Sequence, residues 1–151
     1  MILFPSKLFE IITNSGEEFY PTEACGLVIG REEYNSFKTV TQIIKSKNVA
    51  HIDPSHHFQI DPQVQFDTIR MLAKQNDIGT TEEKIIGHYH SHPDQPAYPS
   101  DTDINMVYEA NLFWLITSVI RGKSIDTKGY IFNKKTNTFD KVGLHISHKD
   151  V

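Results

Sequence analysis

The chain has 151 residues, of which 38% are hydrophobic and 23% charged, the usual size and balance of one globular domain. Its net charge of −4 argues against a nucleic-acid partner, because phosphate binding needs a clustered basic face, and no apolar run could span a membrane or form a secretory signal. Since the one cysteine, Cys25, excludes an internal disulfide and fits a reducing compartment, we expect a cytoplasmic protein with a single domain over residues 1–151.

The start of the chain predicts a helix followed by a pair of strands. Apolar residues at helical spacing indicate an amphipathic helix over about residues 5–18. Pro5 suits its first turn, because the N–H that proline lacks has no partner there. Residues 24–30 have the composition of a short buried strand, and residues 36–44 are its expected antiparallel partner.

A second helix is predicted from its first residues. Asp61 fits the N-cap and Pro62 the first helical position, and the helix is expected to end between residues 76 and 79. A strand over residues 83–90 should follow. The expected apolar face of the helix consists of Phe66, Ile69, Leu72 and Ala73.

The last third of the chain predicts one more helix and several strands. Ser100 is expected to begin the helix, with an inward face made of Ile104, Val107, Tyr108 and Leu112. Residues 112–120 are nearly all apolar and indicate a central strand. Residues 128–133 and 137–146 are expected to form a hairpin. Strands that alternate with helices predict an α/β or α+β fold.

The stretch between the third predicted strand and helix has the composition of a metal site. His90 and His92 are two residues apart, so on an extended segment both imidazoles face the same side and could bind one cation. Catalytic zinc sites commonly have three protein ligands and a water. Asp103, in the first turn of the next helix, is the candidate third ligand.

Hydrolysis at such a cation also needs a base and a group that stabilises the oxyanion. Glu23, just before the strand at residues 24–30, could accept the proton of water, and the Ser100 hydroxyl could face the same cavity. Structural roles compete with these. Ser100 and Asp103 have capping-box spacing, a single H-x-H pair is a weak signal, and Glu23 alone could be a solvated carboxylate or a cap.

The combined pattern is more specific than any part of it. A glutamate, Glu23, precedes H-x-H-P-x(6)-S-x-x-D, formed by His90, His92, Pro93, Ser100 and Asp103. In this pattern the chain resembles the JAMM (MPN+) metallopeptidase family. The segments YPTEACGLVIG, NVAHIDPSHHFQIDP and LFWLITSV are similar to further blocks of its compact prokaryotic branch, so the resemblance covers nearly the whole chain.

The resemblance implies a curved mixed β-sheet flanked by helices, similar to the cytidine-deaminase fold. It implies that His90, His92 and Asp103 bind one Zn²⁺ per chain. It also implies that Glu23 deprotonates the water and passes the proton to the leaving amine, while Ser100 donates a hydrogen bond to the oxyanion.

Other chemistries fit the sequence less well. A cysteine nucleophile at Cys25 needs a paired histidine, and a small buried side chain is the simpler interpretation. The adjacent His56 and His57 would face opposite sides of a strand, and we expect them in a loop or a substrate groove. His88 is expected to pack beside the site or to hydrogen-bond to a ligand. A zinc deaminase needs P-C-x-x-C, which one cysteine excludes, and H-E-x-x-H is absent from the sequence.

Family membership implies a substrate class as well. The JAMM family cleaves bonds that follow the C-terminal, Gly-Gly-type tail of a ubiquitin-like modifier or sulfur-carrier protein. Such a tail can lie extended beside a strand edge and pair with it. Two alternatives stay open, namely a non-catalytic MPN scaffold that only binds partners and a phage tail-assembly or cell-wall-directed peptidase with the same zinc site.

Overall fold

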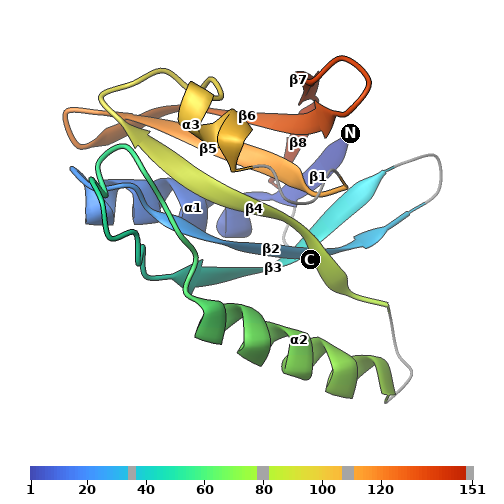
Figure 1. The fold of residues 1–151 in the computed structure, drawn as a ribbon. Helices are drawn as coiled ribbons and strands as arrows, with labels where there is room; N and C mark the ends of the chain where they lie inside the picture. Colours follow the sequence, from blue (N-terminus) through green and yellow to red (C-terminus); the bar gives the residue numbers. More distant parts are fainter. Residues whose placement is uncertain (34–36, 78–81, 107–110, 149–151) are drawn as a thin grey trace.

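The computed structural model describes residues 1–33, 37–77, 82–106 and 111–148, which form eight strands and three helices (Figure 1). In chain order the elements are β1 (Ile2–Pro5), α1 (Ser6–Phe19), β2 (Cys25–Glu32), β3 (Lys38–Ser46), α2 (Pro62–Asp77), β4 (Lys84–Pro93), α3 (Asp101–Asn105), β5 (Phe113–Ile120), β6 (Lys123–Asn133), β7 (Thr138–Val142) and β8 (Leu144–Ser147).

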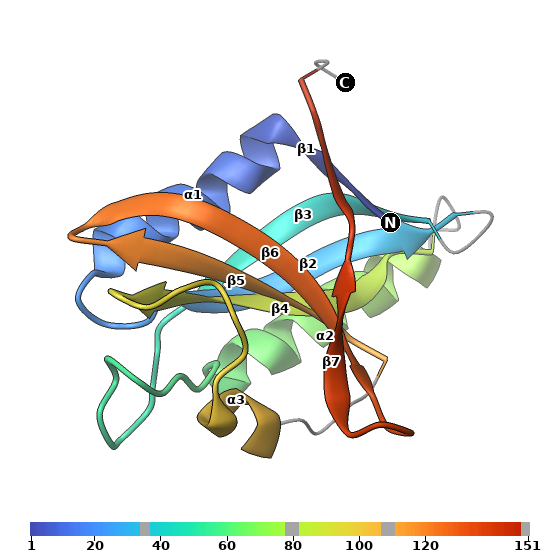
Figure 2. The same ribbon diagram turned by 90° about the horizontal axis from the view of Figure 1, so that it is seen from above.

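All eight strands belong to one sheet, in the order β7-β6-β5-β4-β2-β3-β1-β8. The pairs β1–β3, β1–β8 and β4–β5 are parallel and the other pairs are antiparallel. The end strands β7 and β8 are separated in sequence by Gly143 alone, so the sheet must curl until its two ends meet there (Figure 2). The expected curved mixed sheet flanked by helices is therefore confirmed.

Each face of the sheet is covered by its own helix and has its own core (Figure 1). On one face α1 packs with Val28 and Tyr89, and on the other α2 packs with Cys25 and Trp114. Successive residues of a strand point to opposite faces. Tyr89 therefore points toward α1, whereas His90 belongs to the α2 face and stacks on Phe58 of its core.

The predicted strands and the two longer helices are present, but of the expected inward face of α2 only Leu72 is buried. Phe66 is 63% exposed and Ile69 56% exposed, and Ala73 is exposed as well. The buried positions are Thr68 and Leu72. Thr68 can be buried because its hydroxyl donates to the Val64 carbonyl within the helix at 2.7 Å, so no polar group is left without a partner.

The third helix is shorter than expected. It ends at Asn105, and Ile104 is 36% exposed rather than directed inward. The expected positions Val107 and Tyr108, and the end of α2 near Gly79, lie outside the described residues. The strands β1 and β8 were not predicted separately, and β8 pairs with β1 instead of extending the β6–β7 hairpin. In the described part of the chain, no helix is long and apolar enough to cross a membrane.

Candidate metal centre

The strand β4 places alternate histidines on the α2 face of the sheet, and β2 brings Glu23 beside them. Cys25 lies opposite His90 in the antiparallel β2–β4 pair. The register is extended by the Ser91 amide, which donates to the Ala24 carbonyl (3.0 Å), and by the Ala24 amide, which donates to Ser91 Oγ (2.7 Å). Sequence positions 23 and 90 are therefore neighbours in space.

Four of the five predicted site residues form one buried cluster. His90 Nε2 and His92 Nε2 lie 3.0 Å apart. His90 Nε2 lies 3.1 Å from Asp103 Oδ1, and His92 Nε2 lies 3.1 Å from Asp103 Oδ2. Glu23 Oε1 lies 3.9 Å from His90 Nε2. All four side chains are buried. The ligand atoms of Glu23, His90 and His92 lie within 4.8 Å of one another, a spacing at which they could hold a metal ion, and Asp103 adjoins this group through the two histidines.

The tautomer of His92 favours a metal. His92 Nδ1 lies 3.0 Å from the Pro96 carbonyl oxygen, which can only accept a hydrogen bond, so Nδ1 carries the proton. In the neutral ring this tautomer leaves Nε2, which lies toward His90 and Asp103, as the nitrogen that could bind a metal. The His90 ring is stacked on Phe58, with centroids 4.3 Å apart and planes 14° apart, which fixes its orientation.

The electrostatics of the cluster fit a cation. Burial, with Asp103 and Asp53 adding to it, raises the pKa of Glu23 to about 9. Burial also lowers the pKa of His90. Among the described residues nothing forms a hydrogen bond to Glu23 Oε2 or His90 Nδ1, although both atoms are buried. Buried carboxylates need a compensating charge, and neutral imidazole with carboxylate oxygen is a donor set that zinc accepts.

Asp103 is held in its charged form. Burial raises its pKa, but the neighbouring His90, together with the contacts that His90, His92 and the Ser100 amide make with the carboxylate, outweighs burial and holds the pKa well below its usual range. The Ser100 amide donates to Asp103 Oδ2 at 2.8 Å, and the Asp103 amide donates to Ser100 Oγ at 3.1 Å. The expected capping box is therefore confirmed, and it is also the feature that directs the Asp103 carboxylate at the histidines.

Ser100 lies half-buried beside this cluster as the N-cap of α3. Its oxygen accepts from the Asp103 amide, which leaves the hydroxyl proton available to another acceptor. The structural and catalytic interpretations of Ser100 are thus compatible, and its contact with an oxyanion stays a prediction.

Three successive carbonyls hold the loop between β4 and α3 in place. Ser118 Oγ donates to the Gln95 carbonyl (2.6 Å), His92 Nδ1 to Pro96, and Tyr130 Oη to the Ala97 carbonyl (2.6 Å). This loop connects His92 to the capping box. Its anchors therefore decide where the carboxylate of α3 lies relative to β4, and the H-x-H pattern gave no sign of them.

We predict that Tyr130→Phe destabilises the protein and lowers its activity. Removing the hydroxyl leaves the buried Ala97 carbonyl without its donor, which costs about 1–3 kcal/mol and lowers the melting temperature by roughly 2–4 °C per kcal/mol. Thermal unfolding and turnover measure the two effects. Tyr98→Phe is the matched control, because Tyr98 lies in the same loop and is 56% exposed. Equal melting temperatures for both variants would show that the hydroxyl does not anchor the loop.

The residues set aside from the sequence lie at the margin of the cluster. Burial, with Glu23 adding to it, raises the pKa of Cys25 to about 12, so this thiol stays protonated in the core. His56 is exposed and pairs with Asp53 at 2.8 Å. His88 is half-buried against Trp114, with ring centroids 4.3 Å apart.

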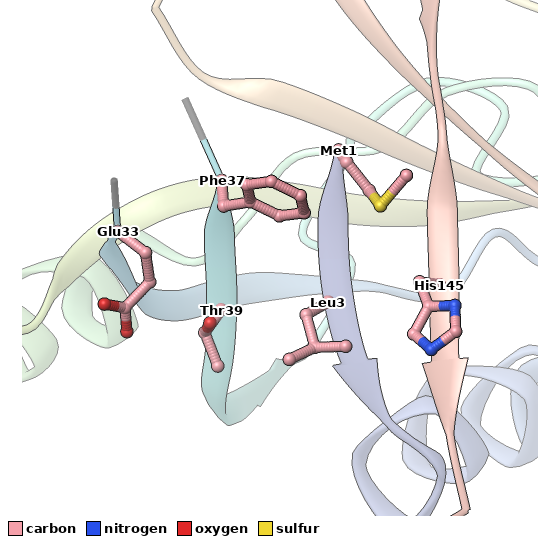
Figure 3. Close-up of a pocket in the computed structure, with 6 residues that line it drawn as sticks. All are labelled: Met1, Leu3, Glu33, Phe37, Thr39 and His145. Atoms are coloured by element: carbon pink, nitrogen blue, oxygen red, sulfur yellow. The ribbon is translucent and has the colours of Figure 1, made fainter. Parts of the chain in front are cut away.

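A cavity of about 920 Å³ adjoins the cluster along α2. His57 and His88 line it, as does Phe58, which stacks on His90. Its other lining residues are Leu27, Ala50, His51, Ile52, Gln59, Ile60, Pro62, Gln65, Ile69, Ile85, Met106, Leu112 and Trp114. A second, open hollow of about 490 Å³ lies at β1, β3 and β8, and no candidate site residue is among the side chains that line it, which Figure 3 shows.

Comparison with known proteins identifies the class. Residues 5–128 match the family described as prokaryotic homologs of the JAB domain. The chain therefore belongs to this family, and the resemblance to the compact prokaryotic JAMM/MPN branch is confirmed.

Individual relatives are similar to different extents. Desampylase of Haloferax volcanii is 31% identical over 98 residues, which are 65% of this chain and 63% of that protein, so the aligned region spans less than two thirds of the relative. A protein from Desulfitobacterium hafniense has a solution structure that matches 99% of this chain and 94% of its own, with a TM-score of 0.82 and 26% identity. A JAB1/MPN domain protein from Archaeoglobus fulgidus matches 98% of each chain with a TM-score of 0.57 and 16% identity, a likeness of fold.

Proposed function

We propose that residues 1–151 act as one domain and form a zinc metallopeptidase. It hydrolyses a peptide or isopeptide bond after the C-terminal tail of a ubiquitin-like modifier or sulfur-carrier protein. The observation that carries the proposal is the buried convergence of Glu23, His90, His92 and Asp103 on one point of the α2 face. The family supports the same activity.

Each residue of the cluster has a task that its surroundings suit. His90, His92 and Asp103 would hold Zn²⁺, and the Pro96 carbonyl keeps His92 in the tautomer that this requires. When bound, zinc supplies a Lewis acid that polarises the carbonyl of the substrate and lowers the pKa of water. Glu23 accepts the proton of the attacking water and delivers it to the leaving amine. Ser100 donates its hydroxyl proton to the oxyanion.

The substrate class rests on the relative and on the shape of the site. The similarity to a protein named desampylase supports a ubiquitin-like modifier. Because β2 and β4 are interior strands with hydrogen-bonded neighbours on both sides, an extended tail finds little free edge beside the strands that carry the cluster. It would lie instead in the 920 Å³ cavity, whose wall is largely apolar and includes His88 and Phe58.

A cleavage assay tests the proposal. We expect the zinc-loaded protein to cleave a fusion in which a Gly-Gly tail of a ubiquitin-like protein precedes the scissile bond. We expect a chelator to abolish cleavage and added Zn²⁺ to restore it, with elemental analysis giving about one zinc per chain. A folded, metal-free protein without turnover would favour the MPN scaffold, and cleavage of cell-wall peptides alone would favour the phage-type peptidase.

A further inference from the structure

Asn48 forms an unusual number of contacts for a half-buried loop residue. It follows β3, and its Nδ2 donates toward three backbone carbonyls, those of His57 (2.9 Å), Glu23 (3.1 Å) and Pro54 (3.3 Å). These carbonyls belong to the residue proposed as the base and to the loop that precedes α2. One side chain therefore joins the loop to the main chain of Glu23.

The other end of the same amide closes the loop on itself. Asn48 Oδ1 accepts from the backbone amides of Ala50 (3.1 Å) and Gln59 (3.0 Å), at opposite ends of the loop. Both residues line the 920 Å³ cavity, and so does His57, whose carbonyl Asn48 binds. Asn48 thus contacts both the cavity wall and the main chain of Glu23.

The position of Glu23 is held by hydrogen bonds of its main chain to this loop rather than by hydrogen bonds of its carboxylate. Its backbone amide donates to the Pro54 carbonyl at 2.8 Å, and its carbonyl accepts from Asn48. Its carboxylate, in contrast, has no hydrogen bond to Oε2 from any described residue, and Oε1 is 3.9 Å from His90 Nε2. The main-chain contacts on either side, to this loop and through Ala24 to Ser91, therefore direct the carboxylate at the histidines.

We propose that Asn48 is a positioning residue that holds Glu23 and the wall of the substrate cavity as one unit. This inference rests on the proposed function, because it assigns Glu23 as the base. A base displaced by about 1 Å from its productive position can lower the rate roughly 100-fold. The side chain of Asn48 forms no hydrogen bond with His90, His92 or Asp103, so its loss should leave the metal ligands in place.

The kinetic test uses Asn48→Ala and Asn48→Asp. The alanine variant removes the whole amide without adding charge, and the aspartate variant keeps an acceptor for Ala50 and Gln59 while losing the donor. We expect both to lower kcat at least tenfold, with a smaller change in KM and with zinc affinity within threefold of the wild type. Asn133→Ala is the matched control, because Asn133 also bonds through both ends of its amide, to Asp140 and the Lys135 amide, in the β6–β7 turn.

Hydrogen exchange gives a readout that needs no turnover. In the wild type we expect the Glu23 amide to be protected by Pro54, and in both Asn48 variants to exchange at least tenfold faster. The Ser91 amide, which donates to Ala24, is the internal reference and should not change. If the variants do not fold, the wild type still decides, because a Glu23 amide that exchanges as fast as an exposed one overturns the inference.

The outcomes separate this inference from the proposed function. Wild-type cleavage with an unchanged kcat in both Asn48 variants would overturn the role of Asn48 alone. Absence of wild-type cleavage on zinc-loaded protein would overturn the proposed function and this role with it. A fall in zinc affinity that matches the fall in kcat would show that Asn48 acts only on general stability.

Discussion

Glu23→Gln is expected to lower kcat by roughly 10²–10⁴, the usual contribution of a positioned general base, while the protein keeps about one zinc per chain. The amide has nearly the same shape as the carboxylate but cannot accept the proton of water. The three proposed zinc ligands, His90, His92 and Asp103, are unchanged. Turnover of the Gly-Gly fusion and elemental analysis of the same sample measure the two effects.

The control separates the base from a general effect of lost charge. Glu10→Gln makes the same chemical change at an exposed position of α1, outside the cluster, and should keep full turnover. Loss of zinc from Glu23→Gln would instead indicate that Glu23 is a metal ligand. Its Oε1 lies 3.9 Å from His90 Nε2, and its ligand atom lies within 4.8 Å of those of both histidines, which would fit that role. Full turnover in Glu23→Gln would remove it from the mechanism.

Local patterns were enough to predict the part of the site that is contiguous in sequence. Alternation along a strand places His90 and His92 on one face, and S-x-x-D spacing predicts the cap that brings Asp103 back toward them. Glu23 is different, because no local rule links it to His90. Its place before a buried strand made it one candidate base, the resemblance to a family supported that choice, and the β2–β4 pairing is what brings it there.

The parts that the sequence did not predict depend on tertiary contacts. In α2 the predicted core face was correct at Leu72, but Phe66 and Ile69 are exposed and Thr68, which is less apolar, is buried. Two periodic stripes on one helix cannot be ranked without the surface against which the helix packs. The strands β1 and β8 have four residues each, and their parallel pairing joins opposite ends of the chain.

Positioning residues are the hardest to predict, because their signal is neither periodic nor chemical. Asn48 and Tyr130 act through backbone carbonyls of distant residues, and an asparagine in a loop or a tyrosine in a strand is common. The hydrogen bonds to their partners, Glu23 and Ala97, join residues far apart in the sequence and can be identified only from the folded structure. The site is therefore an assembly of predictable ligands held by contacts that no short motif encodes.

Asp103→Asn is expected to weaken zinc binding by more than the roughly 10–100-fold that loss of an outer partner costs, because it changes a ligand. The two carboxylate oxygens contact different histidines: Oδ1 lies 3.1 Å from His90 Nε2, and Oδ2 lies 3.1 Å from His92 Nε2. In the asparagine variant the amide nitrogen replaces one of them and donates a proton to an imidazole lone pair that the metal needs. Its oxygen can still accept from the Ser100 amide, so the cap of α3 is kept.

Asp101→Asn is the matched control for this change. Asp101 stands in the first turn of the same helix and carries the same charge, but it is exposed. Zinc titration should therefore separate the two variants, and turnover at limiting zinc should fall only in Asp103→Asn and recover in part when zinc is raised. Equal zinc affinity in both variants would mean that the Asp103 carboxylate does not bind zinc and that α3 supports the site only through its capped N-terminus. The capping box would then be purely structural, and the metal would depend on His90, His92 and Glu23, the three residues whose ligand atoms already lie within 4.8 Å of one another.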